Sequence, residues 1–308
     1  MTPHAVFRCF SLWFRQTRGP FLLLSVALVA VGTAAARSAG PVQHLHVVLL
    51  LAGVIAAHAS VNLFNELSDY NSGIDSNTNR TPFSGGSGLL QAGLTSPAAV
   101  RMAAYGTMIV SGAVGFVFLL IRGWPLLLIM IPAALAVRFY TTHLARWVLG
   151  ELAAGVTLGT LVVAGVYFSL RGTLSADIWA LSVPPGLLTV LLLFLNEIPD
   201  ADADKRGGRR HLVILLGKRR SAVVYAGVLA AVYLLILFNP VFFPIPRTTW
   251  VALLTMPMAV RACLITLVHY NDHQKLLPAQ ALNVGVVLFT DALLAAGYII
   301  EMSIHGMQ

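Results

Sequence analysis

The sequence from residue 44 to residue 75 reads HLHVVLLLAGVIAAHASVNLFNELSDYNSGID, an apolar run followed directly by a polar, acidic segment. The apolar part, residues 44–65, is long enough to cross a bilayer as a helix, which takes about 20 apolar residues. The acidic segment has a counterpart far along the chain, NEIPDADADKR at residues 196–206. Of the 12 acidic residues in the chain, seven lie in these two segments: Glu66, Asp69, Asp75, Glu197, Asp200, Asp202 and Asp204. Carboxylates so concentrated in an apolar protein point to a bound divalent cation.

The composition is that of a membrane protein. The 308 residues are 57% hydrophobic and only 10% charged, and the mean hydropathy is +0.80, whereas soluble domains carry about 25% charged residues. Nine runs are apolar and long enough to span a bilayer: 20–36, 44–65, 98–121, 124–142, 148–170, 177–196, 221–243, 248–269 and 278–300. We therefore predict an all-α bundle of about nine transmembrane helices that forms a single integral-membrane domain over residues 1–308.

The distribution of cations predicts the topology. With the N-terminus inside, only Arg37, Arg122, Arg171 and Arg247 fall on the outer side, which leaves 16 of the 20 Lys and Arg residues inside. This asymmetry matches the positive-inside rule and places both acidic segments, with the N-terminus, on the cytoplasmic face of the inner membrane. The formal charge of +8 is thus explained by cations that flank apolar segments, and it does not indicate a nucleic-acid partner.

The two acidic segments occupy equivalent positions in the predicted bundle. They begin the two long polar connections, residues 66–97 and 197–220, after the second and sixth helices, so their orientations are parallel. This spacing indicates a duplicated four-helix unit plus one extra helix, with the site between the two halves.

Within each segment, oxygen-bearing side chains recur at every fourth residue, which puts them on one face of a helix. Gly73 allows the chain to leave helical geometry and to return Asp75 toward the same point, and Pro199 is expected to kink or end its helix. Carboxylates of this kind suit Mg²⁺ bound together with substrate phosphates. The predicted metal ligands are Asn65, Asp69, Asp75, Asn196, Asp200 and Asp204, and the four aspartates among them are the candidate catalytic residues. The alternative, that these are ordinary polar residues at a membrane surface, is disfavoured by the repetition.

Cations and other polar residues accompany these ligands. Arg80 is placed to bind phosphate oxygens, whereas Lys205, Arg209 and Arg210 either bind phosphate or act as topology signals. Arg138 and Tyr140 can reach a diphosphate or stabilise a carbocation through a ring face. Asn62 either supports the metal site or bonds a neighbouring helix, and Glu151 either complements a helix dipole or contacts an acceptor. The predicted diphosphate ligands are Arg80, Arg138, Lys205 and Arg209; Tyr140 is an additional catalytic candidate, and Asn62 and Glu151 are acceptor candidates.

The two motifs, Asn65-x-x-x-Asp69-x-x-x-Gly73-x-Asp75 and Asn196-x-x-x-Asp200-x-x-x-Asp204, resemble the signatures of the UbiA superfamily of intramembrane prenyltransferases. The resemblance covers nearly the whole chain. The Gly73-x-Asp75 ending, the segment RTPFSGGSG at residues 80–88 and the sequence NEIPD at residues 196–200 are similar to the 1,4-dihydroxy-2-naphthoate branch, which serves menaquinone synthesis. His211 departs from the resemblance, because a Thr is expected before Leu212.

The resemblance implies a transferase that moves a polyprenyl group from its diphosphate to an aromatic ring, with Mg²⁺ as cofactor. Metal ions and basic residues would stabilise the departing diphosphate, and an apolar bundle would accommodate the isoprenoid and shield the allylic cation from water. Dihydroxynaphthoate is the leading acceptor, and hydroxybenzoate, homogentisate or haem remain alternatives. A cation-coupled transporter with an internal repeat is the rival from another class, although transporter sites usually lie near the bilayer midplane.

Overall fold

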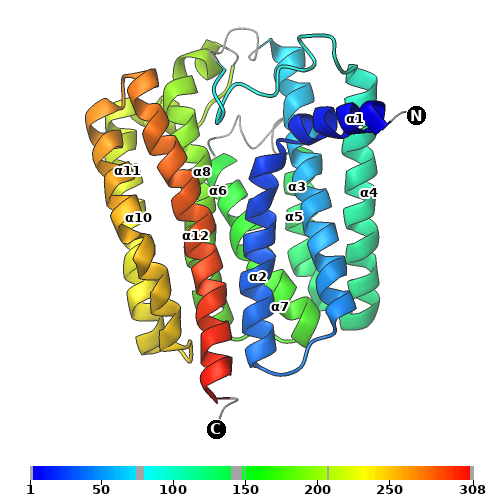
Figure 1. Ribbon diagram of the computed structural model, residues 1–308, viewed down its shortest axis with the longest axis vertical. Helices are drawn as coiled ribbons and strands as arrows, with labels where there is room; N and C mark the ends of the chain where they lie inside the picture. The colour runs from blue at the N-terminus through cyan, green and yellow to red at the C-terminus, as the bar shows by residue number, and fades with distance from the viewer. Residues whose placement is uncertain (1–2, 74–79, 140–147, 149, 207, 306–308) are drawn as a thin grey trace.

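The computed structural model describes residues 3–73, 80–139, 148, 150–206 and 208–305. Over these residues the chain is helical and contains no strand (Figure 1). The helices are α1 (Pro3–Gln16), α2 (Leu23–Ser38), α3 (His44–Ser72), α4 (Pro97–Arg122), α5 (Leu127–Phe139), α6 (Gly150–Ala154), α7 (Leu161–Arg171), α8 (Ala176–Arg206), α9 (Leu212–Leu216), α10 (Lys218–Phe242), α11 (Met256–His269) and α12 (His273–His305). Short 3₁₀ or π segments at 19–22, 124–126, 155–160 and 247–255 extend α2, α5, α7 and α11 at their N-terminal ends.

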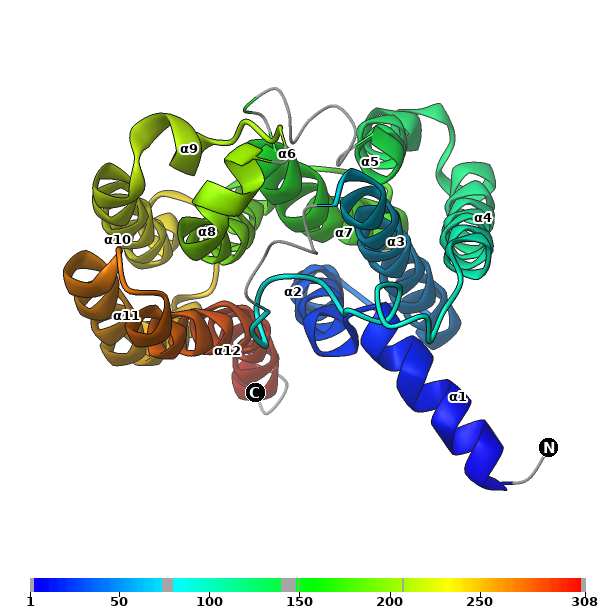
Figure 2. The same ribbon diagram turned by 90° about the horizontal axis from the view of Figure 1, so that it is seen from above.

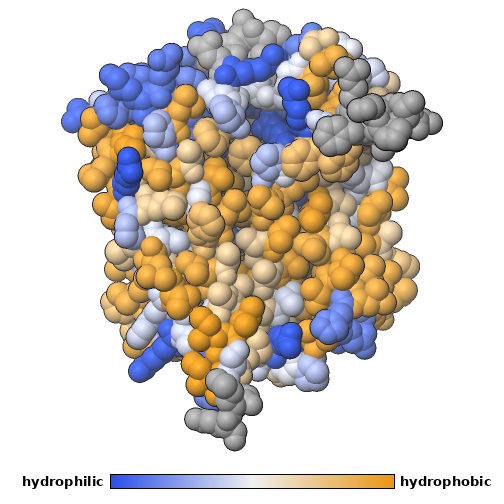
Figure 3. Space-filling view, in the orientation of Figure 1, coloured by the Kyte–Doolittle hydropathy of each residue, from blue (hydrophilic) through white to orange (hydrophobic). Residues whose placement is uncertain are grey.

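The predicted all-α membrane bundle is confirmed. Among the described residues, eight helices are long and apolar enough to cross a bilayer, and the shorter apolar helix Trp124–Phe139 matches the remaining predicted span. Large apolar side chains such as Leu120, Phe242 and Leu254 are more than 70% exposed. They belong to an apolar band around the middle of the molecule, with polar residues gathered toward its two ends (Figure 3). An apolar surface this extensive fits a lipid environment and not water.

Both acidic motifs lie on helices, which corrects the prediction that residues 66 and 197 begin polar connections. Helix α3 continues to Ser72 and α8 continues to Arg206, so the second motif and the described part of the first, as far as Ser72, form the last turns of these helices. Pro199 lies inside α8 and does not end it, because a helix in a packed bundle tolerates proline where neighbouring groups satisfy the freed backbone carbonyl. Gly73 ends α3 with a left-handed φ of 73°, as its lack of a Cβ allows.

Helix α1 was not predicted from the sequence. It lies across one end of the bundle, roughly perpendicular to the other helices (Figure 1), and it exposes Phe10 and Phe14. An amphipathic helix with exposed aromatic residues and a polar face is suited to the interface between headgroups and acyl chains. The arginines of this segment, Arg8 and Arg15, therefore belong to an interfacial helix that precedes the first membrane span.

The bundle brings both motif-bearing helix ends to the end of the molecule where α1 lies (Figure 1). Seen from that end, α3 and α8 stand apart, and α2, α6 and α7 lie between them (Figure 2). Helix α2 packs against α3, α7 and α12. Its approach to α7 depends on Gly32, where a Cβ would lie 2.7 Å from the backbone oxygen of Val163. The space between α3 and α8 is where the candidate site is found.

Candidate active site

A cavity of about 360 Å³ opens at the end of the bundle that carries both motifs. Its polar mouth is formed by α3, α8 and the segments that follow them, and its polar lining includes Asn62, Asn65, Asp69, Asn196, Glu197, Asp200, Asp204, Arg209 and His211. The four-residue spacing in each motif therefore directs these side chains to a common space. Among the predicted metal ligands, all but Asp75 line this cavity; Asp75 and Tyr140 lie outside the described residues.

The cavity becomes apolar away from its mouth and runs deep into the bundle. Its far wall includes Leu50, Phe118 and Leu126, which are all buried. Leu50 and Asp69 both line it, and they are 19 positions apart on α3, so the lining follows about 28 Å of helix at 1.5 Å per residue. This length is close to the roughly 30 Å thickness of a bilayer core.

Arg209 joins the two motifs at the mouth of the cavity. Its guanidinium donates to Asp69 of α3, to Asp204 of α8 at 3.0 Å and to Asn65 of α3 at 3.3 Å. Asp69 and Asp204 are each no more than 3% exposed, and buried carboxylates require a compensating cation. The guanidinium thus occupies the position between the motifs where a metal ion would have oxygen donors from both sides. The donor set, aspartates and asparagine amide oxygens, is the kind that Mg²⁺ prefers.

Neighbouring segments hold the other motif residues in place. Asn196 Oδ1 accepts a hydrogen bond from Gln280 Nε2 of α12 at 3.1 Å, and Asp200 is hydrogen-bonded by Ser84. Ser84 belongs to the Gly/Ser-rich segment that covers the mouth, and its neighbours Gly85 and Gly86 also line the cavity. The second motif is therefore fixed from two directions by parts of the chain that are distant in sequence.

The predicted cationic residues are distributed around the site and not gathered in it. Arg80 is exposed, and its Nε donates to the backbone oxygen of Gly85 at 3.2 Å. Lys205 is exposed at the end of α8 and does not line the cavity. Arg138 lies in a separate surface pocket between α3, α4 and α5, stacked over the rings of Phe64 and Phe139. Arg209 is the one member of the predicted diphosphate set that lines the cavity among the residues described here.

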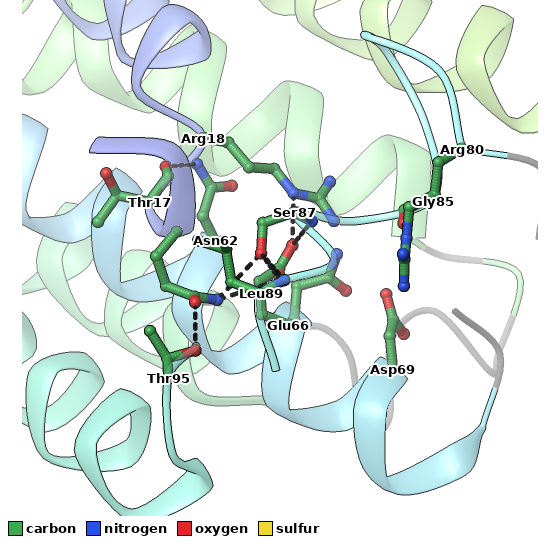
Figure 4. Close-up of polar contacts among 12 residues, drawn as sticks. Thr17, Arg18, Asn62, Glu66, Asp69, Arg80, Gly85, Ser87, Leu89 and Thr95 are labelled. Carbon is green, nitrogen blue, oxygen red and sulfur yellow. Dashed lines mark hydrogen bonds and ion pairs between the residues drawn. The ribbon is translucent and has the colours of Figure 1, made fainter. Parts of the chain in front are cut away.

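Glu66, although part of the first motif, has a different role from Asp69. It is 1% exposed and faces α1, where its carboxylate accepts from Ser87 N (2.8 Å), Ser87 Oγ (2.7 Å), Gln16 Nε2 (3.1 Å) and Arg18 Nε (3.2 Å) (Figure 4). Asn62 Nδ2 likewise donates to the backbone oxygen of Thr17 at 2.9 Å. These bonds attach α1 and the Gly/Ser-rich segment to α3. In the second motif, Asp202 also points away from the site and pairs with Lys218 at 2.8 Å.

Buried Glu151 and His211 and the partly buried Glu197 form a cluster beside Asp204 of the second motif. One potential ligand atom from each residue lies within 4.8 Å of the others, so this group could also hold a metal ion. His211 Nε2 is 3.2 Å from Asp204 Oδ2 and its Nδ1 is 3.5 Å from Glu197 Oε2. Glu151 is fully buried and accepts from the backbone N–H of Leu212 at 2.7 Å, and it is not a lining residue of the cavity.

Sequence reasoning missed the bridging position of Arg209, the cavity-lining position of Arg18 and the cluster around His211. For Arg18 no signal was available, since a lone arginine before an apolar run reads as a topology signal. His211 did carry a signal, because it was one of the two places, with Thr142-His143, where the sequence departed from the family resemblance. Its neighbours Glu151 and Glu197 are 46 residues apart in sequence, so their meeting depends on the packing of α6 against α8.

Comparison with known proteins identifies the fold and family. The family model "UbiA prenyltransferase family" matches residues 23–297. The 2-carboxy-1,4-naphthoquinone phytyltransferase of Synechocystis is 23% identical over 93% of this chain and 92% of its own. The 1,4-dihydroxy-2-naphthoate octaprenyltransferase of Bacillus subtilis is 26% identical over 82% of this chain and 80% of its own.

Solved structures share the same architecture. The apo structure of a UbiA homolog from Aeropyrum pernix superposes with a TM-score of 0.73 at 20% identity, covering 92% of this chain and 98% of that one. A UbiA homolog from Archaeoglobus fulgidus bound to GPP and Mg²⁺ superposes with a TM-score of 0.63 at 15% identity, covering 92% and 99%. The family match extends over most of the chain, including both motifs and the cavity between them. The chain therefore belongs to the UbiA prenyltransferase family and is an integral-membrane prenyltransferase.

Proposed function

We propose that this prenyltransferase transfers a polyprenyl group from polyprenyl diphosphate to 1,4-dihydroxy-2-naphthoate, as a step of menaquinone synthesis. The observation that carries the proposal is the joining of two acidic motifs at the mouth of a deep apolar cavity. An anionic head can bind at the mouth while an apolar chain extends inward. The naphthoate acceptor is supported by the relatives in Synechocystis and Bacillus subtilis, whose names specify naphthoquinone or naphthoate substrates.

Asp69, Asp200 and Asp204, with Asn65 and Asn196, would hold Mg²⁺, and Asp75 belongs to the same predicted set. Bound Mg²⁺ would neutralise diphosphate charge and so favour departure of that group. The homolog structure that contains both GPP and Mg²⁺ supports this assignment. Arg209 joins Asp69 and Asp204 in the present structure. If these carboxylates held Mg²⁺, the Arg209 guanidinium would be available to bind the diphosphate.

The residues around the mouth would bind and orient the head of the donor. Arg209 lines the cavity and presents a planar guanidinium suited to phosphate oxygens. Arg80 and Lys205, which flank the mouth on exposed segments, would provide attraction at longer range. Arg138 and Tyr140 remain candidates for the same task, and Asn62 and Glu151 for contact with the acceptor.

The apolar walls would hold the polyprenyl chain and exclude water. Ionisation breaks the bond between C1 of the prenyl group and the diphosphate oxygen, and the electron pair leaves with the diphosphate. A ring carbon of the acceptor then bonds to C1, and the ring regains aromaticity by losing a proton or, at the carboxyl-bearing carbon, carbon dioxide. Walls lined by residues such as Phe118 and Leu126 protect the allylic cation from hydrolysis.

We further propose that the end bearing α1 and both motifs faces the cytoplasm. The support is the cation count, which assigns 16 of the 20 Lys and Arg residues to that side. Charged diphosphate and naphthoate substrates would then reach the site from the compartment in which such metabolites are made.

The test is to incubate the purified protein in lipid nanodiscs with Mg²⁺, a polyprenyl diphosphate and a panel of aromatic acids, and to identify products by mass spectrometry. We expect prenylated product from dihydroxynaphthoate and loss of at least about 10²-fold in kcat for Asp69→Asn or Asp200→Asn, as for removal of a transition-state-stabilising group. EDTA is expected to stop the reaction and added Mg²⁺ to restore it. Asp202→Asn, whose carboxylate faces Lys218 outside the cavity, is the matched control and should retain activity.

Product from hydroxybenzoate or homogentisate alone would reject the naphthoate assignment while leaving the transferase intact. Full activity in EDTA, or in either motif variant, would contradict the metal assignment. Vesicles that accumulate a solute in dependence on Asp69, with no prenylated product, would instead support the transporter alternative.

A further inference from the structure

Four helices each contribute a row of side chains to the apolar part of the cavity, and each row stops within about two turns of the end of its helix. The last members of these rows are Leu50 of α3, Phe118 of α4, Leu126 just before α5, and Ser169 of α7. In the part of the chain that the structure describes, no residue of α10, α11 or α12 lines the cavity. The cavity is therefore enclosed by α2 to α8 and ends near the side of the bundle opposite the motifs.

Phe118 is the largest of the four side chains at this end, and its surroundings hold it in place. It is 1% exposed, and its ring contacts the ring of His46 on α3 edge to face, with centroids 5.4 Å apart. One turn further along α4, Arg122 Nε donates to the backbone oxygen of Ser169 at 2.7 Å, and its guanidinium also bonds to that of Leu170. These contacts join the end of α4 to α3 and α7. A chain that extends along the cavity therefore meets a fixed ring.

The depth of the cavity sets a length for that chain. Leu50 and Asp69 are 19 positions apart on α3, which corresponds to about 28 Å at 1.5 Å per residue. An isoprene unit has four backbone bonds and so spans about 4.5 Å, at the roughly 1.1–1.2 Å per bond of an extended polypeptide. The depth from the first motif to the closed end thus corresponds to about six isoprene units.

We propose that Phe118 limits the length of the prenyl donor, and that the donors are prenyl diphosphates of up to about six isoprene units. This inference rests on the proposed function, because it places the diphosphate at the mouth and the chain in the apolar part of the cavity. A longer chain must displace the Phe118 ring from a packed position, which overpacks the end of the bundle. Phe118 meets the last unit of the donor and not the reacting carbon. It therefore determines which donor fits and leaves the chemistry unchanged.

The experiment measures chain-length preference by competition. The purified protein in nanodiscs receives an equimolar mixture of geranylgeranyl, hexaprenyl, octaprenyl and decaprenyl diphosphates with Mg²⁺ and the acceptor, and mass spectrometry gives the product ratios. The wild type should favour hexaprenyl over octaprenyl product by at least about tenfold, since small misfits in an apolar pocket discriminate this strongly. Phe118→Ala removes a ring about as large as one isoprene unit, and this preference should fall at least about fivefold. Phe118→Leu keeps most of the packing and should change the ratio in the same direction by less.

A second variant tests the same idea in the opposite direction. Ala57 lines the cavity 12 positions before Asp69 on α3, which is about 18 Å from it. Ala57→Leu should therefore favour geranylgeranyl over hexaprenyl product by at least about tenfold more than the wild type does. Loss of stability alone cannot shift the preference in two opposite directions. Phe116→Ala is the matched control, because Phe116 lies on α4 outside the cavity lining and is 56% exposed, and it should leave the ratios unchanged.

Two results would overturn the inference. One is an octaprenyl-to-hexaprenyl ratio in Phe118→Ala and Phe118→Leu that equals the wild-type ratio. The other is equal use of decaprenyl and hexaprenyl diphosphates by the wild type, because the longer chain would then leave the cavity between helices. Binding is measured separately, from the rise in the midpoint of thermal unfolding that each diphosphate causes without acceptor. Absence of any prenylated product would reject the proposed function, while a larger rise with octaprenyl diphosphate in Phe118→Ala than in the wild type would still support the role of Phe118.

Discussion

Replacement of Glu66 by alanine is the perturbation whose consequence the structure specifies most directly. The Glu66 carboxylate is 1% exposed and holds together three segments: α3, the end of α1 and the Gly/Ser-rich segment. Because it does not line the cavity, its loss is expected to loosen the cover of the site without removing a ligand of the metal or the diphosphate.

The magnitude follows from the donors that would be left unsatisfied. Ser87 N, Ser87 Oγ and Gln16 Nε2 each lose an acceptor at 2.7–3.1 Å, and each such loss costs about 1–3 kcal/mol. The bond to Arg18 adds little, because that side chain is 24% exposed and is screened by solvent. Allowing for non-additivity, we expect local opening of this region to become easier by about 3–5 kcal/mol.

The assay is hydrogen exchange followed by mass spectrometry on peptides that cover residues 80–95. An opening free energy lower by 3–5 kcal/mol accelerates exchange by about 10²- to 5 × 10³-fold where reclosing is fast. Glu66→Gln, which retains one acceptor oxygen, should give a smaller acceleration. Glu301→Ala breaks a comparable bond to Thr248 at the opposite end of the bundle and should leave these peptides unchanged. Exchange within threefold of the wild type in Glu66→Ala would refute the reasoning.

Two further changes test other parts of the argument. Arg209→Gln removes the guanidinium that joins Asp69 and Asp204. Calorimetry without prenyl diphosphate should then show tighter Mg²⁺ binding, whereas KM for the prenyl diphosphate should rise about tenfold or more. Weaker Mg²⁺ binding would contradict this account. Gly32→Leu places a Cβ 2.7 Å from the backbone oxygen of Val163, so α2 and α7 must separate. Because such overpacking costs about 1–3 kcal/mol of stability, the midpoint of thermal unfolding in detergent should fall. Gly112→Leu, where no atom lies within 4 Å of the added Cβ, should leave that midpoint nearly unchanged.

The fold was largely predictable because each membrane span carries its own signal. A segment such as residues 44–65 must be apolar over the bilayer thickness whatever its neighbours are, and the observed helices match the predicted spans. The helix ends were less predictable. The last turns of α3 and α8 are polar, so hydropathy placed them in connections, although packing and hydrogen bonds keep them helical as far as Ser72 and Arg206. Helix α1 was missed because an amphipathic interfacial helix is too polar to register as a span.

The candidate site was predictable only in part. Spacing by four residues directs Asn65 and Asp69 to one face, and it does the same for Asp200 and Asp204; these four side chains line one cavity. Spacing contains no information about which cation approaches them. The role of Arg209 depends on how the chain turns after α8, and the sequence alone left phosphate binding and topology equally open.

The sequence by itself determined that this protein is a helical membrane bundle with two parallel acidic motifs, because hydropathy and i,i+4 periodicity are local properties of the chain. Only the tertiary structure decided which of those acids share a cavity. Asp69 and Asp204 meet through Arg209, whereas Glu66 turns toward α1 and Asp202 toward Lys218. The physical reason is that a helix presents its side chains in every direction, and the elements packed around it decide which side chains face the cavity.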